Sequence, residues 1–585
     1  MRSKFLVAFA LVCIATCDTS AVAAQGNNTY TGADFMWPDS PGNGYLGLYI
    51  DDDITHTRMM STVRTASGQL CSSLEDATCA NQSLSTYSIL PRCETDVQSD
   101  CIESLGATKS GGSVSEGEFS RYFPDRGLGD FIGSPALKIP TGAAPSIFTI
   151  AGAPHSAGDK YMVIASVGGF SPYDRFQRNL TSLIIHASVY PVKVLSGNFS
   201  RNVPSRNTAG VNHESDEKWG NCASIADGYC AARQDFPANT KFSLSLRLSS
   251  APKGWLHGRI FSPSVTYETV GESTRLKVEA APVQVAAVAT WGKYSDLPSA
   301  AKSGSMGCSA STLCSQLNPQ SSGAQTSVDA WRSVYGDKAS WVRGQWMYQT
   351  IADWDITGKS LSMCTSGSPK FYGFVTTNAT GYAAGPPVFN AEEKTLSYVV
   401  ASPHVNAAGG LIVGTYDLMM RSDLASCLYG ADISDIVGSV SVVYDTVTST
   451  ESDMRTDVFN DGIWFKVSAS GFHYSMPTIK TTLRTKSEVL ANPIPVPAGG
   501  TTAVQLADSV VRKSISLRAL AARVQLTISQ GDVLSIRVLK GSQNKCFVVR
   551  QSLRIIKSGS CKVTIRVGSQ LNRARSRTVV LNVAR

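Results

Sequence analysis

Short runs of β-branched and aliphatic residues, separated by glycine, serine and proline, recur along almost the whole sequence. Three of the clearest are KYMVIASVGGF (160–170), KFSLSLRLSS (241–250) and GSVSVVYDTV (438–447). Apolar and polar residues alternate in much of each run, and this period of two is typical of strands with one buried face. We therefore predict a mainly β protein, with a β-sandwich-type body, few helices and a small C-terminal Ig-like β-sandwich.

Further strands are predicted elsewhere in the body, and one segment has a helical pattern. The strands are at 180–195, 273–291, 395–403, 410–420 and 462–474. The helix is predicted over 327–346, where Ser327 can cap the N-terminus and Val328, Trp331, Val334 and Tyr335 share one face. There is no clean internal repeat, which argues against a propeller or a solenoid.

Cysteine spacing predicts a disulfide framework. The chain has 14 cysteines, two of them (Cys13 and Cys17) near the N-terminus. The other twelve pair most simply as Cys71/Cys79, Cys93/Cys101, Cys222/Cys230, Cys308/Cys314, Cys364/Cys427 and Cys546/Cys561. Other connectivities are open, because sequence alone does not fix pairing. No CxxC motif is present, so zinc binding is not predicted.

The N-terminus has the pattern of a secretory signal peptide, which we place at residues 1–24. Arg2 and Lys4 precede a short apolar run, and small residues before Ala23 and Ala24 suit cleavage. An alternative is lipid attachment at Cys17, because the preceding residues loosely resemble a bacterial lipobox. No later apolar run is long enough to span a bilayer. We expect a secreted or cell-surface protein.

Charge is distributed unevenly along the chain. Residues 501–585 contain 16 Lys and Arg against two acidic residues, a net charge of +14, whereas the preceding 500 residues carry 37 basic and 43 acidic residues, a net charge of −6. The Pro- and Gly-rich stretch at 491–500 resembles a linker. We predict β-rich domains at 25–300 and 301–490, the second with a helical insertion, followed by this linker and a basic module at 501–585.

The basic module has short strand-like runs with Lys and Arg at many of the alternate positions. Such charges can simply prevent strand edges from aggregating. They can also attract polyanions. The candidate polyanion-binding residues are Arg537, Lys540, Lys545, Arg550, Arg554, Lys557, Lys562 and Arg566. No helix-turn-helix or zinc pattern suggests a specific nucleic-acid partner.

Sequence motifs of catalysis are scarce. The chain has no GxSxG, HExxH or GxxxxGK[ST] motif, and its seven histidines are isolated. The residues at 51–53 are consecutive aspartates, more typical of a solvated turn than of a calcium loop. Asp353 and Asp355 alternate, so they can share one strand face, but glycoside hydrolysis depends on the spacing of two carboxylates in the fold. We predict no catalytic residue, metal ligand or cofactor.

Aromatic residues offer a further hypothesis, the binding of sugars. Phe35, Trp37, Tyr45 and Tyr49 cluster near the N-terminus, and other tryptophans are scattered. For most of the scattered ones, packing in the core is the ordinary interpretation.

Several phrases resemble known proteins. The stretch ending in GSCKVTIRV (559–567) resembles a small Ig-like module of exported actinobacterial proteins. LPRCETDVQSDCIESL (90–105), GTYDLMMRSDLASCLYG (414–430) and DGIWFKVSASGFHYSMPTIKTTL (461–483) resemble an uncharacterised secreted actinobacterial family. The resemblance implies compartment and architecture but no activity.

These observations favour a secreted, disulfide-stabilised protein of the cell envelope that acts as a surface binding protein or a structural protein, without catalysis. Its expected partners are anionic envelope polymers or extracellular carbohydrate. The alternatives are a secreted polysaccharide hydrolase with carboxylates assembled by the fold, and a lipoprotein adhesin.

Overall fold

A computed structural model describes most of the body and the main strands of the C-terminal part. The residues described are 45–50, 61–124, 130–173, 181–199, 222–296, 332, 336–351, 361–365, 370–383, 385–430, 432, 436–444, 447–449, 455–474, 477–485, 502–506, 514–516, 533–538, 542, 546–549, 552–556, 559–568 and 575–583. The chain forms two compact units. The first comprises 1–252, 258–318 and 342–350, and the second 253–257, 319–341 and 351–585.

The first sheet of the first unit is built around two long antiparallel strands, β8 (Lys160–Ser171) and β9 (Thr181–Ser196). Strand β8 is buried from Tyr161 to Gly168, because both of its faces are covered. The edge of β8 that faces away from β9 pairs with β3 (Leu84–Ile89) and β7 (Ser146–Thr149). Strand β9 also pairs with β11 (Tyr229–Arg233) and β16 (Met347–Thr350). The remaining strands in and beside this sheet are β2 (Thr62–Thr65), β6 (Glu118–Tyr122), β10 (Cys222–Ala226) and β15 (Trp341–Gln345).

The second sheet of this unit is centred on β12 (Thr240–Leu248) and β14 (Ser273–Lys293). Their neighbours are β1 (Tyr45–Ile50), β4 (Cys101–Lys109) and β13 (Gly254–Val270), and β5 (Val114–Glu116) pairs with β4. Side chains from the two sheets meet in the core. The rings of Tyr161 on β8 and Phe242 on β12 lie 5.1 Å apart, and the Trp346 indole N–H donates to the Ala280 carbonyl. Two short 3-10 helices lie at Pro135–Leu137 and Tyr294–Asp296.

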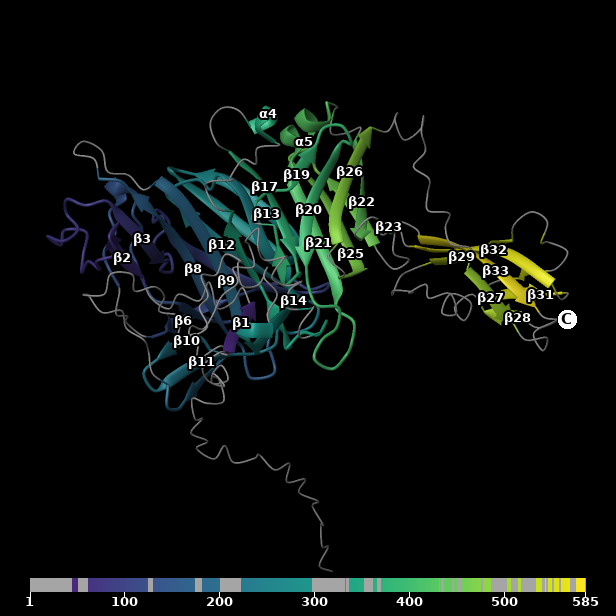
Figure 1. The fold of residues 1–585 in the computed structure, drawn as a ribbon, viewed down its shortest axis with the longest axis horizontal. Coiled ribbons are helices and arrows are strands. Elements are labelled where there is room, and N and C mark those ends of the chain that lie inside the picture. Colours follow the sequence, from purple (N-terminus) through teal and green to yellow (C-terminus); the bar gives the residue numbers. More distant parts are fainter. Residues whose placement is uncertain are drawn as a thin grey trace, which may run out of the picture. The chain divides into compact units, whose positions relative to one another are not determined.

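The body of the second unit also has two antiparallel sheets (Figure 1). One contains β17 (Phe371–Thr377), β21 (Val413–Arg421), β25 (Trp464–His473) and β24 (Arg455–Asn460) in that order. The other contains β18 (Gly381–Tyr382), β19 (Val388–Asn390), β20 (Thr395–Ala401), β26 (Pro477–Thr485), β22 (Ile436–Tyr444) and β23 (Val447–Ser449). The rings of Tyr398 and Tyr416 meet between them at 5.9 Å. Helices α4 (Ser362–Thr365) and α5 (Ser422–Tyr429) lie side by side, joined by a disulfide.

The C-terminal strands form two small sheets. The larger has the order β27 (Thr502–Leu506), β33 (Arg575–Val583), β32 (Gly559–Gly568) and β29 (Val533–Val538). Strands β27 and β33 are parallel, and the other neighbours are antiparallel. The smaller sheet is β28 (Ser514–Ser516), β31 (Ser552–Ile555) and β30 (Cys546–Val549). A disulfide between Cys546 and Cys561 joins the two sheets, and Leu553 and Val563 are completely buried.

The predicted mainly β fold is confirmed. All eight body strands predicted above appear with closely similar bounds, and strands also occur in the C-terminal module. The helix predicted over 327–346 is wrong in its second half, where Trp341–Gln345 is strand β15. Gly344 explains the difference, since glycine disfavours a helix and here lets the strand approach the Phe236 ring, which a Cβ would meet at 2.9 Å. Residues 327–331 of that helix lie outside the described parts, as do the signal-peptide residues, Cys17 and the 491–500 linker. The domain boundaries stay predictions.

Candidate functional site

Five disulfides join the cysteines that spacing pairs: Cys71–Cys79, Cys93–Cys101, Cys222–Cys230, Cys364–Cys427 and Cys546–Cys561. Four connect residues within 15 positions of each other, so they stabilise local structure. The bond between α4 and α5 closes a loop of 63 residues, which constrains the unfolded chain more strongly. Cys308 and Cys314 lie outside the described residues.

The predicted basic residues of the C-terminal part fall on both small sheets. Arg537 on β29 and Lys562 on β32 are exposed. Arg537 lies opposite Thr564, two residues from Lys562, so these two cations share one face of the larger sheet. Arg554 is also exposed, but it lies on β31 of the smaller sheet, opposite the partly exposed Phe547.

The backbone of Arg566 lies on β32, opposite Ser535. Lys540, Lys545, Arg550 and Lys557 lie outside the described residues. The structure therefore brings part of the predicted set together and places Arg554 on a second surface.

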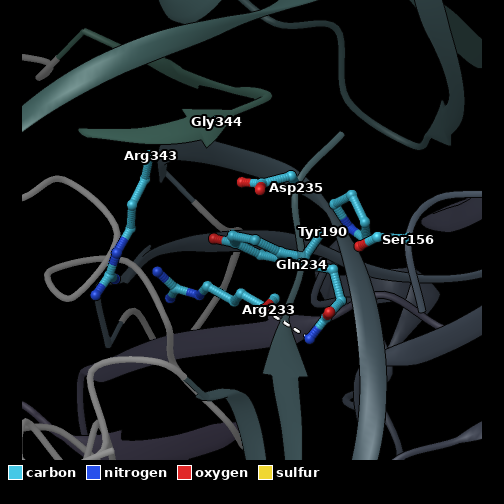
Figure 2. Close-up of a pocket in the computed structure, with 8 residues that line it drawn as sticks. Ser156, Tyr190, Arg233, Gln234, Asp235, Arg343 and Gly344 are labelled. Carbon is cyan, nitrogen blue, oxygen red and sulfur yellow. Dashed lines mark hydrogen bonds between the residues drawn. The ribbon is translucent and has the colours of Figure 1, made fainter. Parts of the chain in front are cut away.

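A pocket in the first unit contains two further arginines, which the sequence analysis did not single out. It has a volume of about 230 Å³ and is lined by Ser156, Tyr190, Pro191, Arg233, Gln234, Asp235, Arg343 and Gly344. Figure 2 shows the guanidinium groups of Arg233 and Arg343 directed toward the same side of the pocket. The Tyr190 hydroxyl and the Asp235 carboxylate extend toward that side as well.

Four chain segments supply these side chains. Arg233 ends β11, and the Gln234 N–H that follows donates to the Pro191 carbonyl at 2.8 Å, which extends the pairing with β9. The Gln234 side-chain amide donates to the carbonyls of Ala232 and Arg233, at 3.2 and 2.9 Å, so its orientation is fixed.

The Arg233 guanidinium lies 4.8 Å from the centre of the Tyr190 ring, a cation–π contact that supports it from one side. Tyr190 itself is buried. Ser156 is in the turn that follows His155. That imidazole contacts the Lys160 carbonyl and accepts from the Ala157 N–H at 3.2 Å. Burial lowers the pKa of His155, which favours the neutral ring that this turn requires.

The described residues that line the pocket include two arginines and one carboxylate, that of Asp235. Two arginines in one pocket can bind an anionic group, with polar neighbours for hydroxyl groups. No signal in the sequence links positions 156, 190, 233 and 343, because only the pairing of β9, β11 and the loops beside them brings them together.

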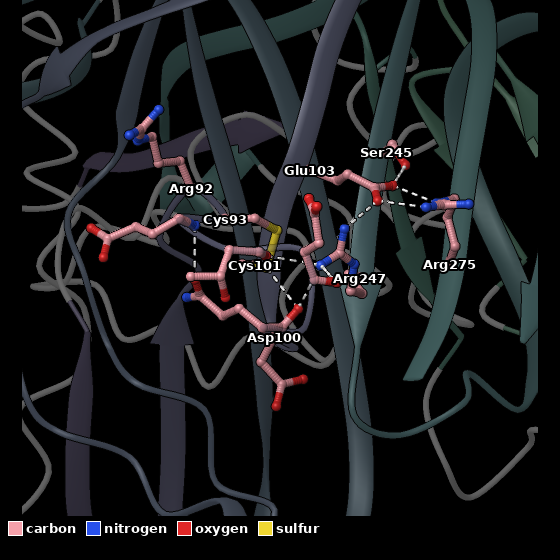
Figure 3. The surroundings of a disulfide bond; sticks show 12 residues. Arg92, Cys93, Asp100, Cys101, Glu103, Ser245, Arg247 and Arg275 are labelled. Atoms are coloured by element: carbon pink, nitrogen blue, oxygen red, sulfur yellow. Dashed lines mark hydrogen bonds and ion pairs between the residues drawn. A yellow bond between two sulfur atoms is a disulfide. The ribbon is translucent and has the colours of Figure 1, made fainter. Parts of the chain in front are cut away.

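A second charged cluster lies beside the Cys93–Cys101 disulfide (Figure 3). The Glu103 carboxylate accepts hydrogen bonds from Arg247 at 2.5 Å, from Ser245 at 2.7 Å and from two nitrogens of Arg275 at 2.5 and 2.7 Å. The hydrogen bonds from Arg275 are the main reason that the pKa of Glu103 falls to about 2. The charged groups of this cluster are hydrogen-bonded to one another, which is typical of a structural cluster.

An acid–base contact lies in the second unit. Asp337 accepts from the His404 backbone N–H at 2.8 Å and contacts the His404 ring, and its Oδ2 also accepts from Arg332 at 2.9 Å. His404 is thus held by an aspartate, and its ring also contacts Arg332 at 3.3 Å. The aspartates weighed in the sequence analysis, 51–53, Asp353 and Asp355, lie outside the described residues.

The tryptophans that the structure describes are mostly in the core. Trp255 and Trp346 are fully buried, and Trp464 is 8% exposed, so these three cannot stack on a sugar. The side chains of the aromatic cluster at 35–49 lie outside the description. Within the described residues, no helix is long and apolar enough to cross a membrane, and no group of three metal-ligating side chains occurs.

Comparison of the chain with protein-family models gave no match, and comparison with curated proteins found no similar sequence.

Proposed function

We propose that this is an exported binding protein, stabilised by disulfides, whose C-terminal strands attach it to anionic polymers of the cell envelope. One observation carries the proposal. Arg537, Arg554 and Lys562 are exposed on the C-terminal strands, whereas Leu553 and Val563 between them are completely buried. These three basic residues therefore face solvent, while Leu553 and Val563 are buried in the core of the described strands.

The arrangement of these cations indicates the kind of anion. Arg537 and Lys562 lie on the outer side of one small sheet and Arg554 on the other, so no single compact anion reaches all three. A flexible polymer can contact both sheets, and the net charge of +14 over 501–585 raises its local concentration. Resemblance to Ig-like modules of exported actinobacterial proteins supports export of the protein and implies no activity.

Compartment supports the proposal independently. Disulfides form and persist in oxidising environments, and five are present in the described residues. A polymer of the wall or envelope is then the polyanion that the protein meets. The alternative, a polysaccharide hydrolase, would need two carboxylates in one cleft. We do not propose it, because Asp235 is the one carboxylate among the described residues that line the pocket.

The test compares the full chain with a variant in which Arg537, Arg554 and Lys562 are all replaced by glutamine. Binding to isolated cell envelopes is measured by co-sedimentation from low to high salt. A cation near an anionic surface contributes about 1 kcal/mol. We therefore expect the triple variant to bind about a hundredfold more weakly at low salt, and wild-type binding to fall steeply as salt is added.

A matched control removes the same charge elsewhere. Lys109, Lys160 and Lys370 are exposed residues of the two body units, and replacing them by glutamine lowers the net charge equally. This control should retain most of the binding. Equal weakening by both variants would show that net charge alone acts. Binding that does not respond to salt would rule out electrostatic attachment.

A further inference from the structure

The pocket of the first unit points to a ligand of its own, separate from the polymer proposed for the C-terminal strands. We propose that it binds a sugar acid, a six-carbon sugar ring that carries a carboxylate, through Arg233 and Arg343. The two guanidinium groups come from different strands and extend into the same pocket (Figure 2). Nothing in the proposal depends on the C-terminal strands.

The first step of the argument is charge. Two guanidinium groups directed toward one space favour an anion there, because each adds to its electrostatic attraction. Arginine is suited to carboxylates, since its planar fork can donate two parallel hydrogen bonds. The cation–π contact between Arg233 and Tyr190, at 4.8 Å, fixes one of the two forks before a ligand arrives.

The second step is the rest of the lining. Gln234 uses its amide N–H groups on two backbone carbonyls, which leaves its side-chain oxygen as an acceptor. Asp235 is a second acceptor, and the Ser156 hydroxyl can donate or accept. Acceptors of this kind suit the hydroxyl groups of a sugar. They suit a phosphate poorly, because its oxygens are mainly acceptors and offer Asp235 and Gln234 few hydrogen-bond donors.

The third step is size. A volume of about 230 Å³ lies below the range of pockets that take drug-sized ligands, about 300–1,000 Å³. It suits one sugar ring. A cationic side, hydroxyl acceptors and room for one ring together select an acidic sugar over a neutral sugar or a small inorganic anion.

The experiment uses the full chain and saturation-transfer NMR, which detects weak binding of small molecules. The probes are glucuronate, galacturonate, glucose, acetate and inorganic phosphate at low salt. We expect one of the two sugar acids to bind at least tenfold more tightly than glucose and acetate. The Arg343→Gln variant should weaken that binding by about tenfold or more, because it removes charge-assisted hydrogen bonds.

Two further variants separate recognition from folding. Arg343→Lys keeps the charge and loses the fork, so it should bind the sugar acid more weakly than wild type and more tightly than Arg343→Gln. Arg121→Gln is the matched control. Arg121 lies outside the pocket, with its guanidinium over the Phe123 ring at 5.5 Å, and its loss should leave affinity unchanged. Circular dichroism checks that each variant is folded.

Several results would overturn the proposal: no binding of either sugar acid, equal binding of acetate or phosphate, or equal loss with Arg121→Gln and Arg343→Gln. A final comparison decides the source of the ligand. If a short oligogalacturonate competes with the monosaccharide, the site accepts a residue of an acidic polysaccharide. If it does not compete while the monosaccharide binds, the site takes the free sugar acid.

Discussion

Glu103 offers a quantitative test of how charge stabilises the first unit. Its carboxylate is 18% exposed and accepts hydrogen bonds from Arg247, Arg275 and Ser245. Arg247 is itself 7% exposed. We consider Glu103→Gln, which keeps the size of the side chain, removes its charge, takes the carboxylate away from Arg247 and leaves Arg275 with Glu268 alone.

The magnitude follows from the pKa of Glu103, which the hydrogen bonds from Arg275 lower from 4.5 to about 2. Such a difference corresponds to about 3 kcal/mol of preference for the ionised form in the folded chain. Partial exposure to solvent reduces this, and we expect Glu103→Gln to lower the free energy of unfolding by about 2 kcal/mol at neutral pH.

The pH dependence has a definite sign. Because the folded pKa lies below the unfolded pKa, the stabilisation is fully present above pH 4.5 and is lost as the pH falls from 4.5 to about 2. The difference in stability between the wild type and Glu103→Gln should therefore shrink across that interval and approach zero at its lower end.

Amide hydrogen exchange at increasing urea concentrations measures the stability of β4 and β12, the strands that carry Glu103 and Arg247. Glu268→Gln is the control within the same cluster, since Glu268 also pairs with Arg275, at 2.6 Å, but is 48% exposed. It should change stability by about 0.5 kcal/mol or less. The reasoning is refuted if Glu103→Gln destabilises no more than Glu268→Gln, or if its effect is the same at neutral and acidic pH.

Other perturbations test the disulfides and the core of the second unit. Replacing the Cys364–Cys427 pair by alanine should lower the free energy of unfolding by about 4 kcal/mol, and the same change at Cys222–Cys230 by about 2.5 kcal/mol, because their loops span 63 and 8 residues. Urea denaturation should give this order, and the reverse order would contradict it. Gly373→Ala should destabilise by about 3 kcal/mol, because the added carbon would lie 2.4 Å from a backbone carbonyl of β21; an unchanged melting temperature would show that the strands separate easily. Asp417→Ala should cost about 3 kcal/mol, since Asp417 is completely buried and accepts from two hydroxyl groups. Asp423→Ala, which breaks an exposed pair, should change the melting temperature little, and equal shifts for these two aspartates would argue against burial as the cause.

Strands could be predicted from the sequence because their signal is local. In β12, Phe242, Leu244 and Leu246 alternate with polar residues, and this period sets a buried face without any knowledge of the neighbours. Disulfide pairs of close spacing were predictable for the same reason. Cysteines eight residues apart can meet across a turn or a hairpin, as Cys222 and Cys230 do on β10 and β11.

Segments whose structure depends on distant partners were harder to predict. The pattern of Val and Trp at 327–346 matched a helix, but Trp341–Gln345 is a strand in which Gly344 packs closely against the Phe236 ring. The basic residues near the C-terminus were recognisable by composition. Their division between two sheets was not, since it depends on which strand Arg554 joins.

By itself, the sequence determined the fold class, the strand positions, most cysteine partners and the charge asymmetry of the chain, because these are properties of residues that are near one another or simply counted. The tertiary structure alone decided the arginine pocket. Ser156, Tyr190, Arg233 and Arg343 lie in separate segments, and no local pattern relates them. They meet because β8, β9 and β11 pair in one register and β15 lies beside them, and the free energy that fixes this arrangement comes from burial across the whole unit.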